Sequence, residues 1–254
     1  MIGTMTIRKY LGGKAQFLVN RYTRFDWNEE QITSAIPYFQ KSPKFKEAYD
    51  FAMTAWDSSK SESPDIRWRL QTVLWAAKAI ACRLETLSRP GVFVECGTGL
   101  GFNASALCRY LEWNELGHRL LLIDTFLPFT PDKNGEQLIA NPISDKYATS
   151  EKEVRIQLQE FERVEIVKGR VPEILGELEN GIKVDFLHID MNSASAEIAA
   201  IEYFWPRLNE GAIVVLDDFA WHDRIDQGEA FDIWSRKLHT PILTLGTGQG
   251  LILK

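Results

Sequence analysis

The residues best suited to chemistry form a glycine-rich run at residues 95–101, E-C-G-T-G-L-G, between an apolar run and a helical pattern. Glycines let a backbone turn sharply and approach a ligand closely at the end of a strand. Phe102 stands where a pyrophosphate-binding loop has its third glycine. Glu95 would repel an anionic pyrophosphate and attract a cationic, amino-bearing ligand. The run therefore favours a ligand other than a dinucleotide.

Two further features extend this nucleotide-like site. The next apolar run ends in Asp124, and an acid at that place can accept both hydroxyls of a ribose. A second glycine turn, at residues 168–172, could flank an adenine. Together they fit S-adenosylmethionine better than a nicotinamide dinucleotide. The residues predicted to bind the cofactor are Glu95, Gly97, Thr98, Gly99, Gly101, Asp124, Thr125, Gly169, Arg170 and Asp190.

A second acidic cluster is predicted where two more apolar runs end, at Asp190 and at Asp217-Asp218. Neighbouring parallel strands would bring these carboxylates together, and unpaired they would repel one another in a partly buried cleft. A divalent cation would relieve the repulsion, and ligands that are all oxygen favour Mg²⁺ over zinc. Such a metal would orient a substrate oxygen and lower its pKa. In the alternative, Asp217 and Asp218 only cap the loop and helix that follow.

Other ionisable residues near this cluster receive separate predictions. His222 follows Asp218 by four residues and is a candidate general base, because an unperturbed histidine titrates near neutrality. The alternative is that His222 is a bystander in a loop. His188 is expected to be buried and hydrogen-bonded. Arg67 and Arg69 could reach the cleft, but we expect them to solvate the outer face of their helix.

These residues require a sheet with their loops at one edge. From residue 92 onward, short apolar runs alternate with helical patterns, which predicts a doubly wound α/β fold. The fold would hold a mostly parallel seven-stranded sheet, a C-terminal antiparallel hairpin and an N-terminal helical cap. Strands are expected at 92–96, 120–124, 164–167, 184–189 and 212–216, with hairpin runs at 241–245 and 250–254. Helices are expected from residue 64 and at 103–113, 150–162, 171–178, 194–208 and 227–238.

A polar run that ends at Pro64 divides the chain into two predicted parts. Residues 1–63 are expected to form a helical cap or lid, and residues 64–254 the α/β domain that binds the cofactor. Ser63 is the expected N-cap of the first helix of that domain. The long loop at 127–149 contains several prolines and is expected to help form the lid. The aromatic residues of the N-terminal part could serve a homodimer contact equally well.

Composition limits the classes of function. The formal net charge of -6 and the pI near 5.4 argue against nucleic acid as a partner. The three cysteines show no spacing typical of metal ligands and suit a reducing compartment. The N-terminus has no apolar run typical of a signal peptide, and no stretch is long enough to span a membrane. We therefore expect a cytoplasmic protein without a membrane partner.

With these motifs, residues 92–254 resemble a class I S-adenosylmethionine-dependent methyltransferase, and more narrowly the macrocin O-methyltransferase (TylF-like) family. The resemblance implies methylation of a hydroxyl on a small molecule, such as a sugar of a natural product. It implies that Glu95 and Asp124 contact the cofactor with Gly97 and Gly99, and that Asp190, Asp217 and Asp218 bind the metal.

The sequence departs from the family pattern at Asn192, where members often carry a second acid that could act as the base. Proton removal then falls to another residue, such as Asp190 or His222, or to the metal alone. Two other hypotheses belong to different classes of protein. A nicotinamide-dependent oxidoreductase is disfavoured by Phe102 and by the absence of a Tyr-x-x-x-Lys pair. A non-catalytic module that binds S-adenosylmethionine is disfavoured because its acids would be costly to keep clustered.

Overall fold

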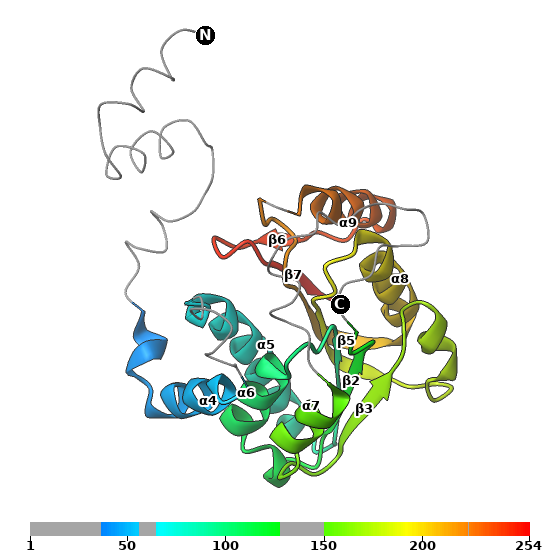
Figure 1. Ribbon diagram of the computed structural model, residues 1–254. Helices are drawn as coiled ribbons and strands as arrows, with labels where there is room; N and C mark the ends of the chain where they lie inside the picture. The colour runs from blue at the N-terminus through cyan, green and yellow to red at the C-terminus, as the bar shows by residue number, and fades with distance from the viewer. Residues whose placement is uncertain (1–36, 56–64, 128–149, 223) are drawn as a thin grey trace, which may run out of the picture. The chain divides into compact units, whose positions relative to one another are not determined.

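The apolar runs of the sequence form the strands of one central sheet (Figure 1). The computed structural model describes residues 37–55, 65–127, 150–222 and 224–254. The described strands are β1 (Val92–Cys96), β2 (Arg119–Asp124), β3 (Val164–Lys168), β4 (Val184–Ile189), β5 (Leu208–Leu216), β6 (Leu243–Thr244) and β7 (Gly250–Leu253). The seven-stranded sheet has the order β3-β2-β1-β4-β5-β7-β6, so consecutive strands are wound outward from β1 on both sides.

The direction of the strands confirms the predicted mostly parallel sheet. β1 to β5 pair in parallel, whereas β7 pairs antiparallel with both β5 and β6. The predicted hairpin is therefore present, and β7 lies between β5 and β6. An open dinucleotide-binding sheet has the strand order 3-2-1-4-5-6 without such an insertion. Register pairs Leu216 with Gly250, which places the start of β7 at the carboxyl end of β5.

Helices cover both faces of the sheet, as the doubly wound prediction requires (Figure 1). One face carries α4 (Pro43–Met53), α5 (Arg67–Thr86), α6 (Phe102–Leu111) and α7 (Glu151–Gln157), and the other carries α8 (Ala194–Phe204) and α9 (Ile225–Leu238). Successive strand residues alternate between these layers: Phe93 packs with the first, and Val94 with the second. Strands covered on both faces explain the nearly continuous apolar runs of the sequence.

Several predicted helices differ from the observed ones. The segment predicted as a helix at 171–178 is instead a 3₁₀ helix, Glu173–Glu177, and it contains Gly176, a residue that disfavours α-helix. The helix predicted at 194–208 ends at Phe204, because Pro206 follows and cannot donate a backbone hydrogen bond. As a consequence, β5 begins four residues before the predicted strand at 212–216.

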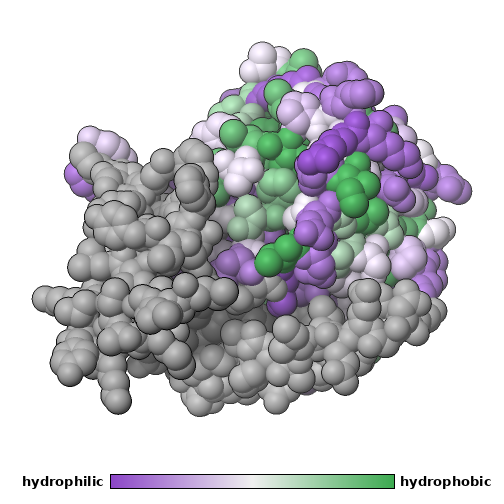
Figure 2. Space-filling view, turned by 90° about the horizontal axis from the view of Figure 1, so that it is seen from above, coloured by the Kyte–Doolittle hydropathy of each residue, from purple (hydrophilic) through white to green (hydrophobic). Residues whose placement is uncertain are grey.

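Some predictions fall outside the described residues. These are the lid at 1–36, the boundary at 63/64 with its N-cap Ser63, and residues 128–149 of the long loop. Among the described residues, Phe45 of α4 is buried in the same apolar cluster as Leu70 of α5. No helix in the described ranges is long and apolar enough to cross a membrane. Figure 2 shows apolar and hydrophilic residues mixed on the face seen from above.

Candidate active site

The glycine loop begins where β1 and β4 end side by side. The Gly97 amide donates to the Ile123 carbonyl at 2.8 Å, and the Asp190 amide donates to the Cys96 carbonyl at 2.8 Å. Gly97 has a φ of +93°, and a Cβ there would lie 1.8 Å from the Asp190 carbonyl oxygen. A side chain at this position would therefore push the loop away from Asp190, which explains the need for glycine.

Gly99 at the tip of the loop is held differently. Its φ is +51°, and a Cβ there would meet no atom within 4 Å. The Gly99 amide donates to Asp124 Oδ2 at 2.8 Å, while Oδ1 accepts from the Phe126 amide at 2.7 Å. The acid predicted to hold a ribose thus also holds the loop in shape. Each carboxylate oxygen has two lone pairs, so Asp124 can still accept hydrogen bonds from ribose hydroxyls.

Two buried polar side chains near the loop have oxygens without a hydrogen-bond partner among the described residues, Glu95 Oε2 and Thr98 Oγ1. Buried polar atoms are seldom left unpaired, so both are available to a polar ligand. Burial raises the pKa of Glu95, and the hydrogen bond from His188 lowers it in part. These orphaned oxygens, with the open space at Gly99, fit a bound S-adenosylmethionine.

The predicted adenine-flanking turn lies at the same edge of the sheet. The Gly169 amide donates to the Asp124 carbonyl at 2.9 Å, and a Cβ at Gly169 would lie 2.6 Å from the Ile174 side chain. Thr125 Oγ1 accepts from the Leu127 amide at 3.3 Å. Arg170 is half-buried beside this turn. Gly169 is therefore required for packing against the 3₁₀ helix. Gly101, also predicted to bind the cofactor, is the left-handed residue before α6.

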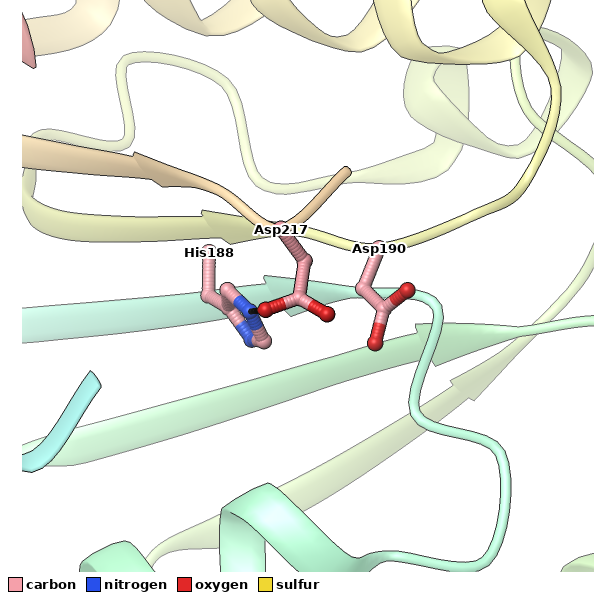
Figure 3. A group of neighbouring side chains, drawn as sticks. All are labelled: His188, Asp190 and Asp217. Atoms are coloured by element: carbon pink, nitrogen blue, oxygen red, sulfur yellow. Dashed lines mark ion pairs between the residues drawn. The ribbon is translucent and has the colours of Figure 1, made fainter. Parts of the chain in front are cut away.

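The acids predicted to cluster do lie together at the carboxyl ends of β4 and β5 (Figure 3). The Asp217 amide donates to the Ile189 carbonyl at 2.9 Å, which joins the two strand ends. Potential ligand atoms of His188, Asp190 and Asp217 lie within 4.8 Å of one another. Asp218 follows directly, with a side chain that is 11% exposed. The arrangement gathers several carboxylates beside the glycine loop.

Arg69 of α5 enters this cluster, contrary to the prediction that it solvates an outer face. Its Nη2 donates to Asp218 Oδ1 at 2.6 Å, to the Asp217 carbonyl at 2.8 Å and also to Asp217 Oδ2. Arg67 makes no such contact: it pairs with Asp65 and is partly exposed. Residues two apart on an α-helix point roughly 200° apart, so the two arginines face different surroundings. Their spacing along the chain does not by itself show which of the two arginines faces the site.

His188 is buried between two carboxylates, in agreement with its predicted role. Its Nδ1 lies 3.0 Å from Glu95 Oε1. Its Nε2 lies 3.6 Å from Asp217 Oδ1, and Figure 3 draws this pair. Burial by itself lowers the pKa of His188, but the carboxylates of Asp217 and Glu95 raise it to about 10. The two carboxylates therefore favour the protonated ring, which links the glycine strand to the acidic cluster.

Gln249 is a site residue that the sequence analysis missed. It is fully buried in the turn before β7 and donates from Nε2 to Asp217 Oδ1 at 2.7 Å and to the Arg69 carbonyl at 3.2 Å. The signal in the sequence was a polar residue inside the predicted glycine-rich hairpin turn. Its significance depends on the insertion of β7 beside β5, which brings this turn to the acidic end of the sheet.

The carboxylates of the cluster are stabilised to different degrees. Burial opposes ionisation of Asp217, but Arg69 and His188 together hold its pKa below the usual value. Burial raises the pKa of Asp190 well above the usual value, and the charges of Asp217 and Asp218 raise it further. None of the described residues donates a hydrogen bond to the Asp190 side chain. Asp190 is thus the acid with the least support from the protein.

The remaining residues of interest surround this acid. Asn192, which replaces the family's second acid, accepts from Arg224 Nε at 2.9 Å. The buried Glu197 accepts from the Met191 amide at 3.0 Å and so holds the backbone that follows Asp190. His222 is exposed, and the centroid of its ring lies 5.1 Å from that of Trp221. Its role as general base stays a prediction.

Comparison with known proteins agrees with this geometry. Residues 94–219 match a family profile described as a methyltransferase domain. Among solved structures, the O-methyltransferase NovP is 17% identical with a TM-score of 0.59, over 73% of this chain and 79% of that one. The calicheamicin methyltransferase CalS11 is 19% identical with a TM-score of 0.56, over 84% and 93%.

A methyltransferase from Podospora anserina, solved with S-adenosylhomocysteine bound, is 16% identical with a TM-score of 0.53, over 91% of this chain and 97% of that one. At such identities these likenesses establish the fold. No curated protein matches the sequence significantly. The match of residues 94–219 adds the class of domain, and both agree with the glycine loop and the strand order observed here.

Proposed function

We propose that this chain, which is a class I S-adenosylmethionine-dependent methyltransferase, methylates a hydroxyl group of a small molecule. The observation that carries the acceptor chemistry is Asp190, a carboxylate beside the glycine loop to which no described residue donates a hydrogen bond. An acceptor hydroxyl can donate to a free oxygen of this carboxylate, and the raised pKa makes the ionised group a stronger proton acceptor.

Separate sets of residues would bind the cofactor and the acceptor. The open tip at Gly99, the carboxylate of Asp124 and the orphaned oxygens of Glu95 and Thr98 would hold the cofactor. When bound, S-adenosylmethionine supplies an activated methyl group on a sulfonium. The acceptor oxygen forms a bond to that methyl carbon as the carbon–sulfur bond breaks, so the reacting atoms must be held in line and water excluded.

The hydroxyl proton must leave as the oxygen attacks. The backbone of Asp190 packs directly against the glycine loop, since its carbonyl oxygen would lie 1.8 Å from a Cβ at Gly97. We assign Asp190 to accept the hydrogen bond and then the proton of the acceptor hydroxyl, and we propose that the exposed His222 passes that proton to solvent. Asn192 has no part in proton transfer, because an amide is not a base at neutral pH.

The sequence also predicts a bound Mg²⁺, but the contacts among the described residues do not fit such an ion. Arg69 already donates to both Asp217 and Asp218, two of the three expected ligands. A divalent cation bound to the same carboxylates would face a guanidinium at hydrogen-bond distance. No step of the proposed reaction therefore passes through a metal.

The class of acceptor is proposed from two names. NovP is an O-methyltransferase, and the apo structure of CalS11 is described as a TDP-rhamnose 3'-O-methyltransferase, at 19% identity and a TM-score of 0.50. The resemblance to the macrocin O-methyltransferase family points the same way. We propose a sugar, free or attached to a nucleotide or natural product, as the acceptor.

The proposal is tested first by calorimetric titration with S-adenosylmethionine and, separately, with NADH. Binding of S-adenosylmethionine alone is expected. The protein is then incubated with methyl-labelled S-adenosylmethionine and a panel of nucleotide-sugars and glycosides. Transfer of label to a sugar hydroxyl supports the proposal. Tight cofactor binding with no transfer to hydroxylated acceptors, together with transfer to amines or thiols, would contradict it.

A further inference from the structure

We propose that Arg69 is the built-in cation of this active site and takes the place that the sequence analysis assigned to a divalent metal. The guanidinium clamps Asp217 and Asp218, so that methyl transfer needs no metal ion. As far as it concerns catalysis, this inference rests on the proposed function. The clamp itself does not rest on the proposed function, because it concerns only the groups that bind the carboxylates of Asp217 and Asp218.

Groups of the protein already face the carboxylate oxygens of Asp217 and Asp218. Arg69 donates to Asp217 Oδ2 and to Asp218 Oδ1, the latter at 2.6 Å. Gln249 donates to Asp217 Oδ1 at 2.7 Å, and Arg224 Nε lies 3.9 Å from Asp218 Oδ2. All four oxygens of the pair therefore face a donor or a cation of the protein. Magnesium requires ligand oxygens at about 2.0–2.1 Å in octahedral geometry and would have to displace these groups.

Arg69 is also held in place on several sides. Its side chain is only 18% exposed, and its guanidinium carbon lies 4.9 Å from the centroid of the Trp221 ring. Gln249 donates to the Arg69 backbone carbonyl as well as to Asp217. An arginine fixed by an aromatic face and by two carboxylates loses little further entropy when substrate binds.

The charges of Arg69 and of the two aspartates also balance one another. A buried arginine without partners would be costly, and so would two adjacent buried aspartates. The positive charge of Arg69 and the negative charges of Asp217 and Asp218 stabilise one another. His188 adds a second cation 3.6 Å from Asp217. Asp190 is left outside the clamp, with a side chain that receives no hydrogen bond from the described residues. The clamp thus leaves one carboxylate for the acceptor.

The test is a calorimetric titration of Mn²⁺ into the full chain with S-adenosylhomocysteine present. The wild type is compared with Arg69→Met, with Arg69→Lys and with the control Arg67→Met, which removes an arginine outside the cluster. We expect the wild type and the control to bind Mn²⁺ more weakly than about 1 mM. Arg69→Met exposes the carboxylates and should bind at least about tenfold more tightly. Arg69→Lys keeps a charge but not the planar fork and should lie between them.

Two outcomes of this titration would overturn the inference. Micromolar Mn²⁺ binding by the wild type, lost in Asp217→Asn, would overturn the inference. Absence of binding in all variants would overturn it too, since the carboxylates would then form no cation site for Arg69 to fill. If circular dichroism shows that Arg69→Met does not fold, the wild type and Arg69→Lys still decide.

Methyl transfer in a chelator separates this inference from the proposed function. Activity that persists in EDTA supports both. Activity that is abolished by EDTA and restored by Mg²⁺ overturns the role of Arg69 and leaves the function standing. Absence of transfer to any hydroxylated acceptor, with the expected Mn²⁺ pattern, leaves the clamp standing and removes the function.

Discussion

The two ends of β4 each carry an acid, and the protein treats them in opposite ways. Asp185, the second residue of the strand, accepts four hydrogen bonds: from Arg89 Nη1 and Nη2 at 3.1 and 2.6 Å, from the Val92 amide at 3.2 Å and from Asn209 at 2.8 Å. Asp190, just after the strand, accepts none at its side chain from the described residues.

The pKa values differ in the same sense. Burial opposes ionisation of Asp185, but hydrogen bonds from Arg89 and Asn209 lower its pKa below the usual value. Burial raises the pKa of Asp190, and the neighbouring acids Asp217 and Asp218 raise it further. An acid whose hydrogen bonds are complete serves the fold, whereas an acid left without donors is available to a ligand. The following predictions test this contrast.

The largest effect is expected for Asp190→Asn. Loss of the carboxylate should reduce kcat for methyl transfer at least about 100-fold, because an amide can still accept a hydrogen bond but cannot take the hydroxyl proton. The dissociation constant for S-adenosylmethionine should change much less. Steady-state kinetics and calorimetry measure the two quantities. Asp185→Asn is the matched control from the other end of the strand, with kcat within about twofold of the wild type. Equal losses in both variants would end the distinction.

Two glycines of the glycine loop test the same contrast at the end of β4 that carries Asp190. Gly97→Ala should destabilise the fold by about 3 kcal/mol or more, since its Cβ would lie 1.8 Å from the Asp190 carbonyl at a φ of +93°. Gly99→Ala, with no atom within 4 Å of its Cβ, should cost about 1 kcal/mol for the left-handed backbone. Its larger effect should be on cofactor affinity. Urea unfolding and calorimetry compare the two variants, and similar unfolding costs would refute this assignment.

At the structural end, Asp185→Asn should lower the free energy of unfolding by about 2 kcal/mol. The change weakens the hydrogen bonds that Arg89 donates to the buried Asp185. The loss of stability is modest because the Arg89 side chain is 38% exposed, so that solvent screens its charge. Denaturant unfolding at pH 7 measures the loss. Asp65→Asn, which affects only the partly exposed pair with Arg67, is the control and should cost less than about 0.5 kcal/mol.

The smallest effect is the pH dependence of that loss. The pKa of Asp185 is lowered in the folded protein, so its ionised form stabilises the fold above the unfolded pKa of about 3.9. This contribution is lost as pH falls through the folded value. The difference in unfolding free energy between wild type and Asp185→Asn should therefore shrink on acidification below pH about 4. A difference that grows there would show the opposite shift.

Much of the fold could be predicted because it depends on local patterns. Apolar runs gave β1 at its observed bounds and β4 likewise, and the glycine turn at 246–250 indicated the hairpin. Helix ends were predicted less well: Glu112 ends α6 in a left-handed conformation, and the segment around Gly176 forms a 3₁₀ helix. Such endings depend on packing against neighbours as much as on residue type.

The candidate site divides along the same line. The acids at strand ends were predictable, because neighbouring parallel strands run in the same direction and their carboxyl ends, with Asp190 and Asp217, lie at one edge of the sheet. The partners of those acids were not. Arg69 lies 148 residues from Asp217 in the chain, and Gln249 lies 32 residues from it. Neither pairing follows from a local period.

By itself, the sequence determined the class of fold, the glycine loop and the acids at the strand ends, because each is encoded by residues close together in the chain. Only the tertiary structure decided what those acids bind. The rotation of α5 turns Arg69 inward, and the insertion of β7 beside β5 brings Gln249 to Asp217. Charges brought together from distant segments interact strongly when buried, so the electrostatics of the site is a property of the assembled sheet.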